Sequence, residues 1–411
     1  MNNLKHSKKG FSVLLSALLL SLSFLSFHIP ANRIPEAQDG IRQNTIFDIF
    51  VRYTDQTGER AALGVIHDLD YHIYWDMNMM SLRTDAEGLA KLSAHDSIAS
   101  IEHSKEYNGL PQTSNLSGDP SSPTTPISSA AKIKQGQWGY NEVEAADAAQ
   151  AGFTGKGVKI AILDTGVSEK SGLKISGGAS TVAGVSSYED DNGHGTFVAG
   201  IIGAKGKAYK GVAPDASLYA VKVMDKDGNG STETLAQGLD WAIRQHMDII
   251  NLSLSFPQES PAIDDLLVKA KEQGITVIVA AGNNGTADGS GDTLAFPAKS
   301  PETITIAAVD SDLHRAAFSG TGSEVELAAP GVGIVSSSTS GKYKVGDGTS
   351  VAAPFVSGMV AVLKQADPTL TPDQVRSALR NSTTDLGTAG RDPQYGYGLI
   401  SFDRLLDDLA K

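Results

Sequence analysis

The chain has 411 residues and a formal net charge of −13, with apolar and charged contents that are ordinary for a globular protein. This length allows two or three domains, one of them large enough for a full hydrophobic core. The acidic balance argues against nucleic acid or an anionic membrane as the main partner. The chain has no cysteine, which excludes disulfide scaffolds, thiol nucleophiles, zinc–thiolate sites and iron–sulfur clusters.

Residues 1–30 have the layout of a secretory signal peptide. Lys5, Lys8 and Lys9 precede an apolar run over residues 11–27. Serines interrupt this run, and it is slightly short for a membrane-spanning helix, although a retained membrane anchor is the alternative. The sequence therefore predicts a secreted, extracellular protein, with association with the cell wall as a variant of this prediction.

Residues 43–107 are expected to form a small α+β domain. A helix is predicted over residues 84–94, with Thr84 as its N-cap and Glu87 completing a capping box. A polar turn is predicted at residues 55–58. Strand patterns cover three segments, namely residues 46–51, 71–75 and 97–102.

The composition changes twice after this domain. Residues 108–132 are rich in Ser, Pro and Thr, and are predicted to be a linker. Over residues 133–405, amphipathic helices such as residues 234–244 and 262–273 alternate with short apolar strands, and Thr371 followed by proline marks a further helix start. This pattern predicts an α/β domain whose parallel sheet is covered on both faces, with its active site at the carboxyl ends of the strands. The predicted strands are residues 158–163, 218–223, 249–254, 276–281 and 303–309.

A serine among glycines opens an apolar helical run near the C-terminus. Ser350 lies in Gly-Asp-Gly-Thr-Ser-Val-Ala-Ala-Pro at residues 346–354, and the apolar stretch 355–363 follows. The start of a helix offers free N–H groups and the positive end of a dipole, and both would stabilise an oxyanion beside the serine. A plain N-cap serine is the alternative interpretation.

A serine hydroxyl becomes a good nucleophile only when a base removes its proton. Three histidines follow the linker, and His246 and His314 are expected to be ordinary surface residues. His194 lies between two glycines at a predicted loop-to-helix junction, which suits a base. Asp164 follows an apolar strand and can fix the tautomer of this histidine, although a turn aspartate is the alternative.

Taken together, these motifs resemble the subtilisin family over residues 138–402. The order Asp164, His194, Ser350 is that of subtilisin and differs from the order in chymotrypsin and in α/β-hydrolases. The similarity is greatest to minor extracellular proteases of spore-forming bacteria. The matching segments are Ala-Ile-Leu-Asp-Thr-Gly (161–166), Asn-Gly-His-Gly-Thr (192–196), Gly-Val-Ala-Pro (211–214), Asn-Leu-Ser-Leu (251–254), Ala-Ala-Gly-Asn (280–283), Gly-Thr-Ser (348–350) and Tyr-Gly-Tyr-Gly-Leu (395–399).

The resemblance implies a subtilisin-like three-layer domain, preceded by a prodomain over residues 43–107 that assists folding and inhibits the enzyme. It implies an Asp-His-Ser endopeptidase that acts through an acyl-enzyme, with Asn283 as the side-chain donor to the oxyanion. It also implies that the substrate binds as an added strand and that a small apolar pocket accepts apolar or aromatic residues before the scissile bond, with broad specificity. Ser255 replaces the usual glycine there and is expected to narrow the entrance. The implied substrate-binding residues are Gly228, Asn229, Gly230, Ser253, Leu254, Ser255, Ala281 and Gly282, with Ala295 near the base of the pocket.

No cofactor is expected for the chemistry, and metal ligands are not assigned. Many family members bind a tight structural calcium through an aspartate that here falls at or beside Gly172, where residues 171–174 have no carboxylate. The second segment of that site, residues 204–210, carries three lysines. Because calcium favours carboxylate oxygens, the usual tight site is predicted to be absent, while weak sites near Asp288 or Asp292 remain open.

The expected partners are protein or peptide substrates and the chain's own prodomain as an intramolecular inhibitor, with no nucleic acid and a monomeric enzyme. Two alternatives belong to other functional classes. One is a processing protease anchored to the cell surface. The other is a catalytically inactive subtilase-like binding module, against which the presence of Asp164, His194, Ser350 and Asn283 argues.

Overall fold

The structure is a computed structural model that describes residues 45–110, 137–206 and 209–409. The expected signal peptide and nearly all of the expected linker lie outside these residues. From Ile46 onward the described residues belong to one compact unit. Among these residues, no helix is both long and apolar enough to cross a membrane.

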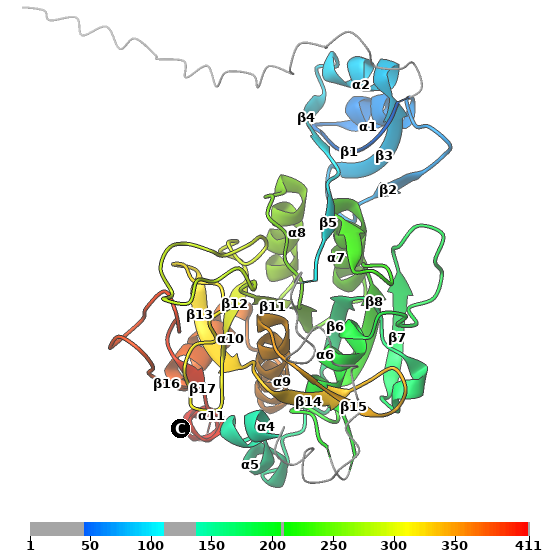
Figure 1. Ribbon diagram of the computed structural model, residues 1–411. Coiled ribbons are helices and arrows are strands. Elements are labelled where there is room, and N and C mark those ends of the chain that lie inside the picture. Colours follow the sequence, from blue (N-terminus) through cyan, green and yellow to red (C-terminus); the bar gives the residue numbers. More distant parts are fainter. Residues whose placement is uncertain (1–44, 111–136, 207–208, 410–411) are drawn as a thin grey trace, which may run out of the picture. The chain divides into compact units, whose positions relative to one another are not determined.

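A nine-stranded sheet forms the centre of the main domain, residues 137–409 (Figure 1). Its strand order is β16-β17-β13-β12-β11-β10-β6-β8-β7, and all neighbours are parallel except β16 and β17. The strands are β6 (Lys159–Asp164), β7 (Ile175–Ser180), β8 (Ser217–Lys222), β10 (Ile249–Leu252), β11 (Thr276–Ala280), β12 (Ile304–Val309), β13 (Val325–Pro330), β16 (Thr383–Thr384) and β17 (Leu399–Ile400).

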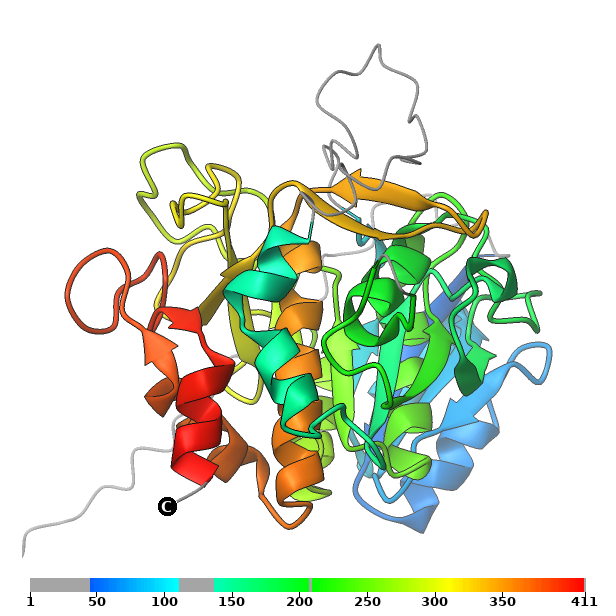
Figure 2. The same cartoon turned by 90° about the horizontal axis from the view of Figure 1, so that it is seen from below.

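Helices cover both faces of this sheet, so that its central strands are buried on both sides (Figures 1 and 2). In β6, Ile160 and Ile162 belong to one hydrophobic core, whereas Ala161 and Leu163 belong to the other. The helices of the first core include α6 (His194–Gly203) and α9 (Thr349–Ala366), and those of the second are α7 (Thr232–Arg244) and α8 (Pro261–Glu272). The predicted three-layer α/β fold with a mostly parallel sheet is confirmed.

Smaller elements complete the main domain. Thr371 caps the helix that follows it, because its side chain accepts a hydrogen bond from the Gln374 N–H and Gln374 bonds back to Thr371. This predicted helix start is confirmed. The elements are α4 (Trp138–Glu142), α5 (Ala145–Gln150), the 3₁₀ turn η1 (Glu169–Ser171), β9 (Asn229–Ser231), the hairpin β14 (Ile334–Ser337) and β15 (Tyr343–Gly346), α10 (Pro372–Asn381) and α11 (Phe402–Leu409).

The N-terminal module, residues 45–110, contains a second and antiparallel sheet of order β2-β3-β1-β4. Its hydrophobic core includes Ile49, Val51 and Leu82 from the sheet and Ala62 and Leu92 from the two helices. A last strand, β5 (Glu106–Asn108), pairs with β9 of the main domain. The other elements are β1 (Ile46–Tyr53), α1 (Gln56–Leu63), β2 (Tyr71–Ile73), β3 (Met79–Asp85), α2 (Ala86–Ser93) and β4 (Ile98–His103).

The predicted polar turn at residues 55–58 is wrong, since these residues open helix α1. Asp55 is the N-cap, and its side chain accepts hydrogen bonds from the N–H groups of Thr57 and Gly58. Gly58 favours a turn by composition, yet it lies inside the helix. A Cβ atom at this position would be 2.4 Å from the Ser97 carbonyl oxygen. Close packing against the residue before β4 therefore requires the glycine.

The predicted N-cap of the second helix is displaced by one residue. Asp85, not Thr84, caps α2 by accepting a hydrogen bond from the Gly88 N–H. Thr84 belongs to β3, and its hydroxyl donates to the Val65 carbonyl. Glu87 makes an ion pair with Lys91 at 2.8 Å instead of completing a capping box. Strand β3, in the middle of this sheet, was not predicted.

The strand order places a topological switch beside β6. Strands β8 and β7 lie on one side of β6, and β10 to β13 lie on the other. In open α/β sheets, ligands bind at the carboxyl ends of the strands where the order reverses. The residues that follow β6 and β10 therefore lie at the expected position of a site.

Candidate active site

Asp164 and His194 are in contact because the end of β6 lies beside the start of α6. Asp164 is the last residue of β6, and His194 is the first residue of α6. The Nδ1 atom of His194 lies 2.8 Å and 3.0 Å from the two carboxylate oxygens of Asp164, and both side chains are buried. A Cβ atom on Gly195 would be 2.1 Å from the Gly166 carbonyl oxygen, so the glycine after the histidine permits this close approach.

The environment of His194 favours its charged form. Burial disfavours the imidazolium, but the charge and hydrogen bond of Asp164, together with the charge of Asp190, outweigh burial and raise the pKa of His194. The other ring nitrogen, Nε2, is buried and has no hydrogen-bond partner in the described part of the chain. The structure shows no hydrogen bond between Nε2 and the Ser350 hydroxyl. Such catalytic hydrogen bonds often tighten only when the substrate binds.

Ser350 is the second residue of α9, the long helix that packs on one face of the sheet. It is buried, and it lies in the first helical turn, where backbone N–H groups have no partner within the helix. The dipole of an 18-residue helix adds partial positive charge at this end. This location suits the formation of negative charge beside the serine.

Asn283 and Ser350 approach the same space beside Gly348. A Cβ atom on Gly348 would lie 2.9 Å from the Ser350 hydroxyl oxygen and 3.4 Å from the Asn283 amide nitrogen. The amide oxygen of Asn283 accepts hydrogen bonds from the N–H and the hydroxyl of Thr349, both at 2.9 Å. This pair of bonds orients the amide so that its NH₂ group faces the space beside Gly348.

Two polar residues, one in β10 and one directly after it, hold the start of α9 in place. The Ser253 hydroxyl donates to the Ser350 carbonyl oxygen at 2.8 Å and accepts from the Asn251 side chain at 3.0 Å. Asn251 in turn accepts from the Ser357 hydroxyl at 2.8 Å. Sequence reasoning assigned Ser253 to the substrate-binding strand only, and it missed this contact with the backbone of the serine.

The two predicted substrate-binding edges bind one common segment. Strand β5 pairs with β9 in antiparallel register, with Tyr107 opposite Gly230 and Asn108 opposite Asn229. One residue further, the Gly109 N–H donates to the Gly228 carbonyl at 3.0 Å, and the Gly109 carbonyl accepts from the Ser255 N–H at 3.2 Å. Residues 106–109 thus lie between the edge at residues 228–230 and Ser255.

The predicted pocket walls lie near one another. Gly282 has a φ of 94°, in the region that favours glycine. A Cβ atom on Gly282 would be 3.5 Å from the Ala295 Cβ and 3.6 Å from the Ser255 hydroxyl oxygen. Ala281, Ala295 and Leu254 are buried. The walls are therefore small and apolar, with one hydroxyl.

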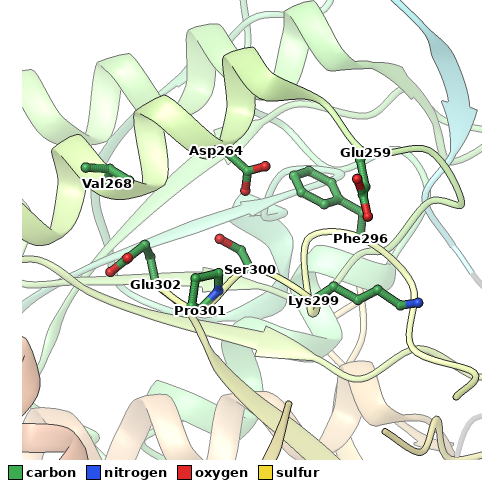
Figure 3. A pocket seen from close by; sticks show the side chains of 8 residues that line it. All are labelled: Glu259, Asp264, Val268, Phe296, Lys299, Ser300, Pro301 and Glu302. Atoms are coloured by element: carbon green, nitrogen blue, oxygen red, sulfur yellow. The ribbon is translucent and has the colours of Figure 1, made fainter. Parts of the chain in front are cut away.

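A different pocket, of about 250 Å³, lies beside the N-terminal half of α8 (Figure 3). Its Phe296 ring packs edge-on against Phe256, and the carbonyl of its Glu259 accepts a hydrogen bond from the ammonium of Lys105, the residue before β5. Two of its charged residues are already paired, Lys299 with Asp292 at 3.0 Å and Glu302 with Lys271 at 2.9 Å. Its lining residues are Glu259, Asp264, Val268, Phe296, Lys299, Ser300, Pro301 and Glu302.

The residues considered for calcium are largely committed to other contacts. Asp292 pairs with Lys299, and Asp288 accepts hydrogen bonds from Thr286 and from the backbone and hydroxyl of Ser290. Gly172 ends η1 in the left-handed region, and Lys205 makes an ion pair with Asp215 at 2.7 Å. A third group, Asp310, Asp312 and His314, brings two carboxylates and an imidazole within 4.8 Å of one another at an exposed turn.

A mostly parallel α/β sheet, with the Asp164–His194 pair and Ser350 near the carboxyl ends of its central strands, is the arrangement of subtilisin-type serine endopeptidases. The sequence profile of the subtilase family matches residues 155–398, which is more than half of the chain. The chain belongs to the subtilase family, as the sequence motifs predict. It is therefore a hydrolase that acts on protein substrates.

Three relatives place the chain within this family. It is 38% identical over 366 residues to the minor extracellular protease Epr of Bacillus subtilis (strain 168), covering 88% of this chain and 55% of that protein. The chain thus spans about half the length of that relative. It is 33% identical over 409 residues to the alkaline elastase YaB of Bacillus sp. (strain YaB), covering 96% and 98%. It is 43% identical over 262 residues to subtilisin DY of Bacillus licheniformis, covering 63% and 94%.

Proposed function

We propose that this chain is the precursor of a secreted endopeptidase that cleaves peptide bonds through Asp164, His194 and Ser350. The observation that carries the proposal is the approach of the Ser350 hydroxyl and the Asn283 amide to one space beside Gly348. A nucleophile and an oxyanion donor must share such a space with the reacting carbonyl.

In this mechanism His194 removes the hydroxyl proton of Ser350 as the oxygen attacks the substrate carbonyl. The unpartnered Nε2 atom is free for this role, because Nδ1 is bound to Asp164. Asp164 holds the tautomer and stabilises the imidazolium. His194 then donates the proton to the leaving amine, and water releases the acyl group from Ser350 by the reverse steps.

Negative charge on the carbonyl oxygen is stabilised by the Asn283 NH₂ group and the Ser350 N–H. The hydrogen bonds from Thr349 to Asn283 support this assignment, because a donor oriented in advance does not need to reorganise during the reaction. No cofactor takes part in these steps.

The substrate is proposed to bind as an added strand between residues 228–230 and 253–255. The pairing of β5 with β9 supports this mode, because the chain's own segment makes the backbone hydrogen bonds that such a substrate would make. The small apolar walls around Gly282 favour an apolar or aromatic residue before the scissile bond. The hydroxyl of Ser255 narrows this pocket compared with a glycine.

The N-terminal module is proposed to be a prodomain that inhibits the enzyme by occupying the substrate-binding edge. The module also binds the starts of both helices on that face of the main domain, through a side chain at one and a backbone carbonyl at the other. Glu102 accepts from the Ser260 hydroxyl at 2.6 Å and from the Ala262 N–H at 3.0 Å, at the first turn of α8. The Lys105 carbonyl accepts from the Thr232 N–H at the start of α7. These contacts satisfy N–H groups that a helix leaves without partners.

A further contact supports a specific complex between the N-terminal module and the main domain. Asp240 of α7 is buried, and its carboxylate accepts a hydrogen bond from the Trp75 N–H at 2.8 Å and contacts the His72 ring at 2.8 Å. Buried carboxylates need such partners, since an unpaired one is costly. Removing the module would take these two partners away from Asp240 and leave it with Arg244, whose guanidinium lies 3.7 Å away.

An extracellular location is proposed because the Bacillus subtilis relative is named an extracellular protease. Fractionating cells and medium would distinguish a processing protease anchored to the cell surface from an enzyme released into the medium. An inactive binding module would give no hydrolysis by any preparation of the mature chain.

The proposal is tested with Ser350→Ala, expressed and purified beside Ser323→Ala, which changes an exposed serine. Ser350→Ala is expected to stay full-length and to hydrolyse no peptide, whereas Ser323→Ala matures normally. In subtilisin, loss of the nucleophile lowers turnover about a million-fold. Maturation of purified Ser350→Ala without another protease would contradict self-processing, and full peptidase activity would contradict the assignment of the nucleophile.

A further inference from the structure

A carboxylate outside the predicted triad accepts hydrogen bonds from residues on both sides of His194. Asp190 is 4% exposed, and its first oxygen accepts from the Thr165 hydroxyl at 2.9 Å and from the N–H groups of Asn192 and Gly193 at 3.0 Å and 2.8 Å. Its second oxygen accepts from the N–H and the hydroxyl of Thr196 at 2.9 Å and 2.5 Å. All of these donors except Thr165 flank His194 in the sequence.

The same network reaches Asp164. The Thr165 N–H donates to Asp164 at 2.7 Å, and the Thr165 hydroxyl accepts from the Gly195 N–H at 3.0 Å while it donates to Asp190. Thr165 therefore connects the end of β6 to the first turn of α6. A change at Asp190 would remove hydrogen bonds that hold the backbone on both sides of His194.

The charged groups around His194 come from four segments. They are Asp164 of β6, Asp190 and Asp191 in the loop, Lys222 of β8, and Lys344 of β15, whose ammonium lies 3.9 Å from the Cβ position of Gly193. Lys222 is buried and bonds to the Thr165 carbonyl at 2.7 Å and to Asp191 at 2.8 Å. In the described part of the chain, no cation lies within ion-pair distance of Asp190, so its charge acts on its surroundings.

We propose that Asp190 is a positioning residue of the catalytic site, which fixes His194 relative to Asp164 and stabilises the imidazolium by its charge. This inference rests on the proposed function of His194 as the base. Asp190 thus has two separate roles, one in the geometry and one in the charge of the site, and different variants test them.

Asp190→Asn keeps the shape of the side chain but removes the charge and turns one acceptor into a donor that faces the donors of Thr196. We expect kcat to fall about tenfold to a hundredfold with little change in KM, because a misplaced base costs turnover. The acidic midpoint of kcat/KM should move down by about one pH unit, as the imidazolium loses a nearby negative charge. Thr165→Val should lower kcat without moving this midpoint, because it breaks the network but keeps the charge.

Asp215→Asn is the matched control, since it removes a half-exposed aspartate on a different loop. It should change neither kcat nor the midpoint. Rates are divided by active sites counted with an irreversible serine-directed inhibitor, so that poor folding of a variant is not read as slow turnover. A normal kcat per active site and an unmoved midpoint in Asp190→Asn would overturn the proposal and leave Asp190 with a structural role only.

The pKa of His194 is also measured by NMR in the Ser350→Ala precursor, with His194→Gln used to assign the ring signal. Asp190→Asn should lower this pKa by about one unit, and Asp215→Asn should leave it in place. This measurement needs no turnover. Absence of hydrolysis with a shifted pKa would count against the proposed function alone, whereas an unshifted pKa would overturn the electrostatic role of Asp190.

Discussion

The rings of Tyr107 and Phe256 stack face to face, with centroids 4.5 Å apart and an 8° angle between their planes. Tyr107 is the central residue of β5, and Phe256 follows residues 253–255, the second proposed substrate-binding edge. Both rings are buried, so this contact anchors the N-terminal module on the main domain. An aromatic anchor of this kind is typical of the residues that dominate binding.

Tyr107→Ala should weaken the complex of the N-terminal module with the main domain. The expected cost is about 2 kcal/mol, or about a thirtyfold rise in the dissociation constant. For the measurement, the Ser350→Ala precursor is cut in the linker by an added protease, and the dissociation constant of the two parts is determined. Tyr71→Ala is the control, because Tyr71 is an exposed tyrosine of the same module. Equal dissociation constants for the two variants would contradict the anchor.

Asn283→Ala should lower kcat and leave KM nearly unchanged. The amide is placed for an oxygen that becomes negative only in the transition state, so its loss affects turnover more than binding. In subtilisin, removal of this kind of donor costs about a hundredfold to a thousandfold in kcat. The neighbouring exposed residue provides the control, as Asn284→Ala. A raised KM with an unchanged kcat would show that Asn283 binds the substrate and does not stabilise the oxyanion.

Activity should fall on acidification with a midpoint above the ordinary histidine value of about pH 6.5. Burial opposes the imidazolium, but Asp164 and Asp190 outweigh it and raise the pKa of His194. Since only the neutral ring can accept the serine proton, a raised pKa moves the loss of activity to higher pH. The measurement is the pH profile of kcat/KM with a neutral peptide. A profile that stays flat down to about pH 5 would rule out His194 as the base.

The main sheet and the position of Asp164 at the end of β6 were predictable because their signals are local. The apolar run at residues 158–163 is buried on both faces, and Asp164 ends it as expected. Strand β13 was missed because Glu326 interrupts its apolar pattern. That carboxylate is buried only because Arg376 and Arg380 lie 3.3 Å and 2.8 Å from it, and these residues are far away in the sequence. No local pattern contains this pairing.

The parts of the site that sequence reasoning missed depend on contacts between distant segments. Asp190 lies two residues before the motif of His194, but its proposed role appears only when Thr165 donates to it across 25 residues. Likewise, the Ser253 hydroxyl bonds to the backbone of Ser350 across 97 residues. A sequence motif identifies the residue types at a site, whereas the hydrogen-bond directions require the folded chain.

The N-terminal module should bind more weakly as the pH rises. A pocket of about 470 Å³ brings carboxylates of both parts together, and Arg83 pairs with two of them, Asp48 and Asp70. Burial and the charges of Asp48 and Asp225 raise the pKa of Glu106. Burial also raises the pKa of Glu233, against a hydrogen bond from Ser81.

A pKa that is higher in the complex than in the separated parts means that binding takes up protons. Affinity should therefore be greatest below the ordinary glutamate pKa of about 4.3, fall as the pH rises through the raised values, and stay level above them. The measurement is the dissociation constant of the cut Ser350→Ala precursor against pH. Glu106→Gln should flatten part of this dependence, and Glu87→Gln, which changes an exposed glutamate of α2, should not. Affinity that rises with pH would contradict the prediction.

Calcium removal should have little effect on the stability of the mature enzyme, because the usual tight calcium site is predicted to be absent. Residues 171–174 offer no carboxylate, and calcium needs six to eight oxygen ligands. On the other side, Lys205 is held by Asp215 at 2.7 Å, and residues 204–210 carry three ammonium groups that would repel a cation. We therefore expect the rate of thermal inactivation to be similar with added calcium and with a strong chelator, measured beside subtilisin DY as a reference. Lys205→Gln should leave the calcium response unchanged, because removing one of three lysines supplies no ligand.

A large loss of stability on chelation, together with an ion bound between Gly172 and residues 204–210, would prove the prediction wrong. A moderate loss without an ion there would instead indicate a weak site, for which Asp288 and the turn at Asp310 are the places to examine by mutation to asparagine.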